Sequence, residues 1–364
     1  MARVLFLSPT YYDEASVIGG SERYVHELAT EIGQTHDLRL VSFGPQRARQ
    51  RIGSYQRYVY RAWHDGVFSI HNPLSLAWWH HLWWADLVHA FQISTLQSDL
   101  ATVFAQLSRR PFCMTDNGGG GWFILHKRLP VILRGQQGIG HSRYAAQRLR
   151  AKGMSQVHRL PGGVRVPPGA GNWPEEKRAE IVFVGRLLEH KGPHLICEAM
   201  RRFPKTWPGK ARIIGRPYDP AYLEKLHHAA EGLPVEFVHD ATDAEVALAI
   251  RRARVLVAPS ISPPNGAVSE LLGITTLEAL ALGTVPVVST AGALHEIVEL
   301  GGVGAVFREN DPEDLARALT AVWDDPPPPS RCRAVARRFD WSAVGRLHLA
   351  LYADLLKDPD KHGG

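Results

Sequence analysis

Two series of short apolar runs, each alternating with helix-like segments, constrain the fold of this chain more than any other feature. The first series starts with RVLFLS at 3–8 and continues through LRLVSF, DLVHAFQ, PFCMTDN and IGHS. The second starts with EIVFVGRL at 180–187 and continues through ARIIG, VEFVHD, ARVLVAPS and TVPVVST. Strands that alternate with helices are typical of parallel α/β sheets. The sequence therefore predicts an α/β fold with two Rossmann-like domains.

A segment rich in proline and glycine, PGGVRVPPGAGNWPEEKR at 161–178, separates the two series and is predicted to be a linker. We expect an N-terminal domain over 1–165 and a second domain over 166–339. After the proline run DDPPPP, the segment WSAVGRLHLALYADLLK is predicted to form one last helix. Two α/β halves joined by a linker are expected to enclose a cleft at the carboxyl ends of their strands, where parallel sheets bind ligands.

Charge and composition narrow the choice of partners and compartment. The net charge of +6 favours anionic partners, such as nucleotides, other phosphates or a membrane surface. The basic residues form no run of five or more, so nucleic acid is not an expected partner. Cys113, Cys197 and Cys332 show no metal-binding spacing, and we expect reduced thiols. With neither a signal sequence nor a long apolar run, the protein is predicted to be cytoplasmic, with peripheral membrane contact left open.

The stretch SELLGITTLEAL at 269–280 places one carboxylate on each side of a predicted strand-to-helix turn. A helix that begins between Gly273 and Thr275 would offer unpaired N–H groups, which favour a phosphate. Glu278, one turn into the helix, could then accept hydrogen bonds from the two hydroxyls of a ribose. Glu270 would point toward the group attached beyond the phosphate. The alternative is that both glutamates are surface acids that complement the helix dipole.

Two basic residues follow the first strand of the second series. Arg186 and Lys191 lie in GRLLEHKG, five positions apart. Such a pair could neutralise a diphosphate. The alternative is a solvated basic loop.

These residues resemble a known family. GRLLEHKG, the spacing of Glu270 and Glu278, and LEALALGTVPVV are similar to the nucleotide-sugar glycosyltransferases of the GT-B fold, and more narrowly to the retaining GT4-type enzymes. GGSER, HSRYAAQRL and LPGGV resemble further segments of that family. The resemblance implies two Rossmann-like domains that face each other across a cleft. It also implies that 340–364 cross back onto the N-terminal domain.

The resemblance implies a role for each residue at the donor site. Arg186 and Lys191 would contact the diphosphate, Ile274 and Thr275 would offer backbone N–H groups to it, Glu278 would hold the ribose and Glu270 would face the sugar. Gly19 and Gly20 would let the N-terminal loop approach the diphosphate closely. The nucleobase is expected at two strand ends, which carry Gly215, Arg216, His239 and Asp240.

The implied reaction is transfer of a sugar from a nucleoside diphosphate to a hydroxyl of a small-molecule or saccharide acceptor, with retention at the anomeric carbon. A phosphate oxygen would take the acceptor proton, and neither a metal nor another cofactor is expected. The base, the sugar, the acceptor and the oligomeric state remain open. The main alternative is a GT-B-fold sugar-nucleotide epimerase. A phosphorylase, a two-domain binding protein and a nucleic-acid binder are weaker alternatives.

The chain departs from the family pattern in TDNGGGGW at 115–122, where the family often carries a histidine. Asp116 and Asn117 occupy that neighbourhood, and we expect them, together with the loop at 118–121, to contact the donor sugar or the acceptor. A plain turn is the alternative.

The segment LAWWHHLWWADLVHAF at 76–91 carries four tryptophans at helical spacing. A buried helix face is the favoured interpretation, and an acceptor platform or a membrane contact is the alternative. His80 and His81 are neighbours in sequence, so they are expected on different sides of the helix and not as ligands of one metal. His89, at a strand end, is a candidate for the acceptor side.

Overall fold

The chain divides into two compact units. The structure, a computed structural model, describes residues 1–11, 20–63, 72–118, 125–133, 136–167, 179–202, 209–263 and 270–357. Unit 1 comprises Met1–Gly163 and Trp341–Gly364, and unit 2 comprises Val164–Asp340. The boundaries expected from the sequence lay at 165/166 and 339/340. The last helix therefore belongs to unit 1, although unit 2 precedes it in the chain.

Unit 1 contains an eight-stranded sheet in the order β3-β4-β2-β1-β5-β6-β7-β8. All neighbouring strands are parallel except β3, which is antiparallel to β4. The strands are β1 (Arg3–Tyr11), β2 (Asp37–Gly44), β3 (Ala48–Ile52), β4 (Tyr55–Arg61), β5 (Leu87–Phe91), β6 (Phe112–Thr115), β7 (Gln137–Gly140) and β8 (Gln156–Arg159).

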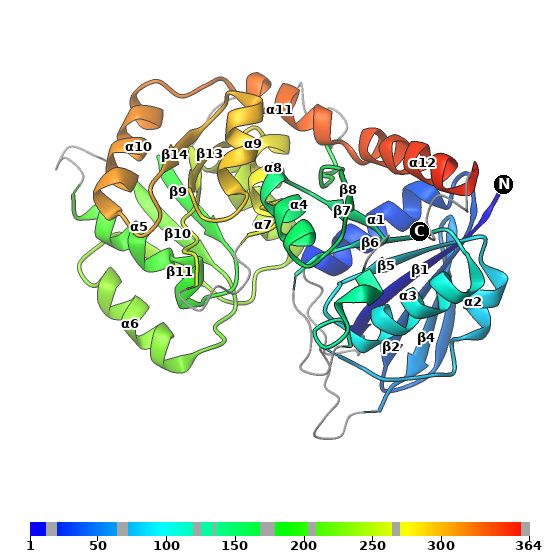
Figure 1. Cartoon of the computed structure of the whole chain (residues 1–364). Coiled ribbons are helices and arrows are strands. Elements are labelled where there is room, and N and C mark those ends of the chain that lie inside the picture. Colours follow the sequence, from blue (N-terminus) through cyan, green and yellow to red (C-terminus); the bar gives the residue numbers. More distant parts are fainter. Residues whose placement is uncertain are drawn as a thin grey trace. The chain divides into compact units, whose positions relative to one another are not determined.

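Helices cover both faces of this sheet, because successive residues of a buried strand point to opposite sides. Val4 and Phe6 of β1 pack beneath α1 and α12, whereas Leu5 and Leu7 pack on the side of α2, α3 and α4. Figure 1 shows α12, in red, beside α1, in blue. The helices are α1 (Gly20–Ile32), α2 (His80–Trp84), α3 (Leu96–Ser108), α4 (Arg143–Ala151) and α12 (Trp341–Lys357), with a short 3-10 turn, η1 (Pro130–Leu133).

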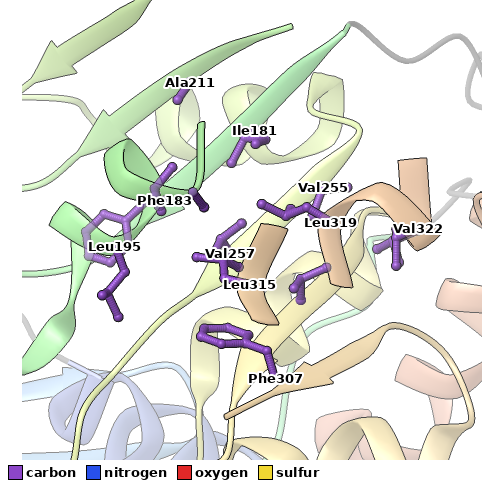
Figure 2. Close-up of a cluster of buried hydrophobic side chains, with 14 of the residues drawn as sticks. Ile181, Phe183, Leu195, Ala211, Val255, Val257, Phe307, Leu315, Leu319 and Val322 are labelled. Carbon is purple, nitrogen blue, oxygen red and sulfur yellow. The ribbon is translucent and has the colours of Figure 1, made fainter. Parts of the chain in front are cut away.

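Unit 2 contains a six-stranded parallel sheet in the order β11-β10-β9-β12-β13-β14. Figure 2 shows side chains of β9, β10, β12 and β14 meeting those of α5 and α10 in one apolar cluster. The strands are β9 (Glu180–Val184), β10 (Lys210–Ile214), β11 (Val235–Val238), β12 (Val255–Ala258), β13 (Val285–Ser289) and β14 (Ala305–Phe307). The helices and 3-10 turns are η3 (Glu189–Lys191), α5 (Pro193–Met200), α6 (Pro220–Ala230), α7 (Asp243–Arg252), α8 (Ile274–Ala281), α9 (Leu294–Gly301), α10 (Pro312–Asp324), α11 (Pro329–Ala336) and η4 (Arg337–Phe339).

The two parallel sheets and the packing of the last helix confirm the predicted fold class. The sequence missed four strands: β3 and β4 lie where arginines and tyrosines interrupt the apolar pattern, and β8 and β14 have four and three residues. No helix among the described residues has the length and apolar character needed to cross a bilayer.

The tryptophan segment differs from its prediction. Helix α2 has five residues, Trp78 is fully buried, and Trp83 is 64 % exposed. The rings of His80 and His81 lie with centroids 4.2 Å apart, and Nε2 of each faces the hydroxyl of Tyr60, at 3.3 and 2.8 Å. The expectation that the two histidines point to different sides was wrong. Helix α2 is a single turn that begins at His80, and both rings face Tyr60 on β4.

The expectation for His89 was also wrong. Its ring is fully buried and lies 2.6 Å from the hydroxyl of Tyr352 on α12 and 2.7 Å from that of Thr115 on β6. A second buried histidine, His348, lies 3.1 Å from the hydroxyl of Tyr24 on α1. These imidazoles join the last helix to the sheet and are part of the core.

Stability should fall in acid because histidines of unit 1, among them His89, His141 and His348, are buried without charge. Burial is the main reason that the pKa of His89 lies well below its ordinary value and that those of His141 and His348 fall to about 4. As the pH falls, these histidines therefore become protonated in the unfolded chain before they do so in the folded protein. The stabilisation is complete above the ordinary histidine pKa of about 6.5 and is lost as the pH falls toward about 4. We expect the free energy of unfolding, measured by urea denaturation, to fall between about pH 7.5 and about pH 5. The decrease should be roughly 1–2 kcal/mol for each of these histidines.

The matched variant is His348→Gln, which keeps a hydrogen-bonding side chain but cannot become charged near neutrality. The difference in unfolding free energy between this variant and the wild type should narrow as the pH falls. A constant difference over this range would contradict the assignment of an uncharged His348.

Candidate active site

The clearest candidate site of unit 2 lies where the direction of its sheet order reverses. The chain runs from β9 outward to β10 and β11, and then returns to β12 on the other side of β9. At such a point the loops that follow the two strands separate and leave room for a ligand at the carboxyl ends. Arg186 and Lys191 follow β9, and Glu270 and Gly273 follow β12.

Glu270 is the centre of a polar cluster at this point. Lys191 Nζ donates to Glu270 Oε1, and Ser260 Oγ donates to the same oxygen at 2.9 Å. The side chains of Lys191 and Glu270 are each 21 % exposed. Burial by itself would raise the pKa of Glu270, but the charge of Lys191 and the two hydrogen bonds outweigh burial and hold the pKa below its ordinary value. Glu270 is thus a carboxylate at neutral pH.

The loops after β9 and β12 are joined by their backbones. Ile261 N–H donates to the carbonyl of His190 at 2.7 Å. Gly192, at φ +69°, passes so close to the other loop that a Cβ would lie 2.0 Å from the carbonyl oxygen of Pro259. Only glycine fits this approach. This contact fixes Lys191 with respect to the loop after β12.

The backbone of Glu270 is held from a third loop, which follows β13. Ala293 N–H donates to the carbonyl of Glu270 at 2.8 Å. A Cβ on Gly292, at φ +56°, would lie 2.3 Å from that same oxygen. Ser289 Oγ donates to the carbonyl of Ser260 at 2.6 Å. Three loops therefore position the carboxylate and its two donors before any ligand binds.

Helix α8 begins beside this cluster without a side-chain cap. Its N-cap residue is Gly273, at φ +79°. Among the described residues, no acceptor is found for the N–H groups of Ile274 and Thr275, and Thr276 Oγ1 is fully buried without a hydrogen-bond partner. Free N–H groups at the positive end of a helix, with a buried hydroxyl beside them, form an anion site.

The other predicted donor residues of this region surround the cluster. Glu278 is half-buried on the second turn of α8. Arg186 is exposed, and its guanidinium lies 5.9 Å from the ring centroid of Tyr218. Burial, followed by the charges of Lys191 and Arg186, lowers the pKa of His190, so both cations lie near this imidazole. Positive charge therefore gathers at the loop after β9.

The residues predicted to hold the nucleobase lie at neighbouring strand ends. His239 Nδ1 donates to the carbonyl of Gly215 at 3.1 Å. A Cβ on Gly215 would lie 1.7 Å from the carbonyl oxygen of Gly185, so β9 and β10 approach closely only with glycine here. Arg216 and Asp240 follow these strands and are exposed.

In unit 1, Asp116 and Asn117 already have partners. Asp116 Oδ2 pairs with Lys152 Nζ at 3.0 Å, and its other oxygen accepts from Gly118 N–H at 3.1 Å. His141 Nε2 lies 3.0 Å from the amide oxygen of Asn117, while the buried amide nitrogen of Asn117 has no partner among the described residues. The negative charge of Asp116 is balanced within unit 1, and Asn117 keeps a free donor.

Several predicted parts of the site are only partly described. Gly20 begins α1 and is exposed, whereas Gly19 lies outside the described residues. Within the glycine loop, the structure describes Gly118 but not 119–121, and it does not describe 264–269, which precede Glu270.

Sequence reasoning missed Ser260 and the buried carboxylate of Asp99. Ser260 could have been found, because it is the first polar residue after a buried strand at the carboxyl edge. Asp99 could not: it is fully buried at the start of α3, where it lies 2.7 Å from Nδ1 of His126 and accepts from Leu125 N–H at 2.6 Å. No local pattern connects residues that far apart in the chain.

The sequence is similar to those of known glycosyltransferases. Residues 171–339 match the family Glycosyl transferases group 1. Glycogen synthase of Mycobacterium tuberculosis is 26 % identical over 402 residues, which cover 96 % of this chain and 94 % of that protein. Phosphatidyl-myo-inositol mannosyltransferase of Mycolicibacterium smegmatis is 29 % identical over 217 residues, which cover 56 % of this chain and 53 % of that protein.

Solved structures share the architecture over nearly the whole chain. A glycosyltransferase from Rickettsia africae has a TM-score of 0.74 at 16 % identity, with 98 % of this chain and 99 % of that chain covered. HepE from Anabaena, in complex with UDP, has a TM-score of 0.71 at 17 % identity, with 97 % of this chain and all of that chain covered. The chain therefore has the fold of solved glycosyltransferases, and nearly all of unit 2 matches the family Glycosyl transferases group 1.

Proposed function

We propose that the protein is a retaining, GT4-like glycosyltransferase that moves a sugar from a nucleoside diphosphate to an acceptor hydroxyl without a metal ion. One observation carries the proposal: Glu270, bound to Lys191 and Ser260, lies at the switch point of a parallel sheet in which α8 begins without a side-chain cap. Anabaena HepE was solved with UDP and with UDP-glucose, which supports a nucleotide sugar as the donor.

The diphosphate would bind at the first turn of α8. The N–H groups of Ile274 and Thr275 would donate to its oxygens. The buried hydroxyl of Thr276 would gain a hydrogen-bond partner. Lys191 and Arg186 would supply the balancing positive charge. These interactions strengthen as the glycosidic bond breaks, because negative charge then grows on the leaving diphosphate.

Two carboxylates would orient the rest of the donor. Glu278 would accept from the ribose hydroxyls. Glu270 uses only Oε1 for Lys191 and Ser260, and its Oε2 accepts no hydrogen bond from the described residues. Oε2 could therefore bind a sugar hydroxyl, and its charge would favour an oxocarbenium-like sugar.

The reaction would break the bond between the anomeric carbon and the diphosphate oxygen and form one to the acceptor oxygen on the same face. The acceptor proton would pass to an oxygen of the departing diphosphate, so no protein base is required. The nucleoside diphosphate leaves with the electron pair of the broken bond.

The remaining assignments extend this proposal. Gly215, Arg216, His239 and Asp240 would surround the base. Gly20 and Asn117 lie at the carboxyl edge of the unit 1 sheet and would meet the sugar or the acceptor, with Asp116 positioning the same loop. All three cysteines are free and buried, which supports a reducing, cytoplasmic compartment. The epimerase alternative is not favoured, because the named relatives are synthases and transferases.

A panel of UDP-, GDP- and dTDP-sugars tests the proposal. We expect slow release of free sugar and nucleoside diphosphate from one of them, and proton NMR of a transfer product should show the anomeric configuration of the donor. Return of an isomeric nucleotide sugar would indicate an epimerase.

Changes at the cluster should separate chemistry from binding. Lys191→Met removes the cation that stabilises the leaving group, and we expect kcat/KM for the donor to fall about 100-fold.

Glu278→Gln removes an ionic acceptor for the ribose, and we expect the donor KM to rise roughly tenfold with a smaller change in kcat. Steady-state release of nucleoside diphosphate measures both.

Unit 2 offers matched controls for these two variants. Lys210 and Glu236 form an exposed ion pair on β10 and β11, so Lys210→Met and Glu236→Gln should keep wild-type kinetics. Circular dichroism should show that all four variants fold. Near-normal turnover in both Lys191→Met and Glu278→Gln would contradict the assignment of these residues to the donor site.

Metal independence gives a separate expectation. EDTA should leave turnover unchanged, because Lys191, Arg186 and the start of α8 supply the positive charge. A complete loss of turnover that a divalent cation restores would contradict this part of the proposal while leaving the transferase assignment intact.

A further inference from the structure

A second concentration of positive charge lies in unit 1, on the side of the sheet that carries α2. Residues 38–63 hold six arginines and no carboxylate. The pairing of Arg49 with Tyr58, and of Tyr58 with Val41, puts these side chains on the face that α2 covers. Four of the six gather on this side, and we name them the arginine face: Arg39, Arg47, Arg49 and Arg51.

Aromatic rings hold three of these guanidinium groups in place. Arg39 lies 3.8 Å from the ring centroid of Trp84, Arg49 lies 5.2 Å from that of Tyr58, and Arg47 lies 5.5 Å from that of Tyr60. Arg39 also donates to Nδ1 of His81 at 3.2 Å, and Arg49 donates to the amide oxygen of Gln56 at 3.1 Å. A guanidinium has five N–H donors, so each keeps further donors for planar anions such as phosphate. The arginines are therefore oriented in advance for phosphate oxygens.

The charge of the arginine face is not neutralised by the described residues. Within 38–85 the only carboxylate in the sequence is Asp65, which lies outside them. No described carboxylate forms an ion pair with any of the four arginines. At the edge of this face, burial is the main cause that lowers the pKa of His81 to about 3, and the charges of His80, Arg39, Arg47 and Arg49 lower it further.

Exposed apolar side chains stand beside these charges. Trp83, next to Trp84 on α2, is 64 % exposed and packs edge-to-face on Phe104 at 4.9 Å. One turn along α3, Leu107 is 83 % exposed. Arg110 donates to the carbonyl of Trp83 at 3.2 Å and brings another cation to this point. Interfacial segments of membrane-bound proteins combine tryptophan, leucine and arginine in this way.

We propose that the arginine face and its apolar neighbours dock unit 1 onto an anionic lipid bilayer. The arginines would bind headgroup phosphates, and Trp83 and Leu107 would enter the interface between headgroups and acyl chains. A dissolved polyanion would match the charge but would leave these apolar side chains in water. The proposal concerns an interaction surface and does not depend on the donor chemistry of unit 2.

Sedimentation with vesicles tests the proposal on the full-length protein. The protein should sediment with vesicles of phosphatidylcholine and phosphatidylglycerol and stay in solution with phosphatidylcholine alone. Arg49→Gln should weaken partitioning about fivefold, and the double variant Arg49→Gln/Arg51→Gln more strongly, since each basic residue near an anionic leaflet contributes similarly. Trp83→Ala should also weaken it several-fold.

The opposite face of the same sheet offers matched controls. Arg346 and Leu347 are exposed on α12, so Arg346→Gln and Leu347→Ala should sediment like the wild type. Equal sedimentation with both kinds of vesicle, or an equal loss in the control variants, would overturn the proposal. The proposal would also be overturned if Trp83→Ala sedimented like the wild type and the protein bound heparin as tightly as it binds anionic vesicles. The arginine face would then bind polyanions in general.

Discussion

The ion pair between Lys191 and Glu270 is the interaction on which the site in unit 2 depends. Two charges that are only one fifth exposed need each other, since a single one would lie partly desolvated without a partner. Lys191 comes from the loop after β9, and Glu270 from the segment that follows β12. Their contact thus joins the two sides of the switch point. The close approaches of Gly192 and Gly292 fix both backbones, so the carboxylate and the ammonium are held before a donor arrives.

Much of this arrangement could be predicted from the sequence. The start of α8 at Gly273 followed from a turn between an apolar strand and an amphipathic helix, and the strands β9 to β13 followed from continuous apolar runs. Those signals are local. The hydrogen bond from Ser260 to Glu270 and the buried pair of Asp99 and His126 depend on loops that meet only in the folded sheet, so spacing along the chain could not reveal them.

The errors of the sequence interpretation also have physical causes. His89 was assigned to the acceptor side because it lies near a strand end, yet the pleat of β5 turns its ring beneath α12. The rings of His80 and His81 lie side by side because α2 is a single turn and both imidazoles face the hydroxyl of Tyr60. In both cases the tertiary contact of an aromatic ring decided the outcome, and periodicity carries no information about such contacts.

The position of α12 has a consequence for biosynthesis. This helix buries Val344, Leu351, Tyr352 and Leu355 against the same sheet face that α1 covers in part. All of unit 2 lies between that sheet and α12 in the chain, so a ribosome must complete unit 2 before it makes the helix. Until then the nascent first unit keeps an apolar strip open to solvent, where a chaperone or an aggregating neighbour can bind. A helix made after unit 2 thus closes the sheet that was made before it.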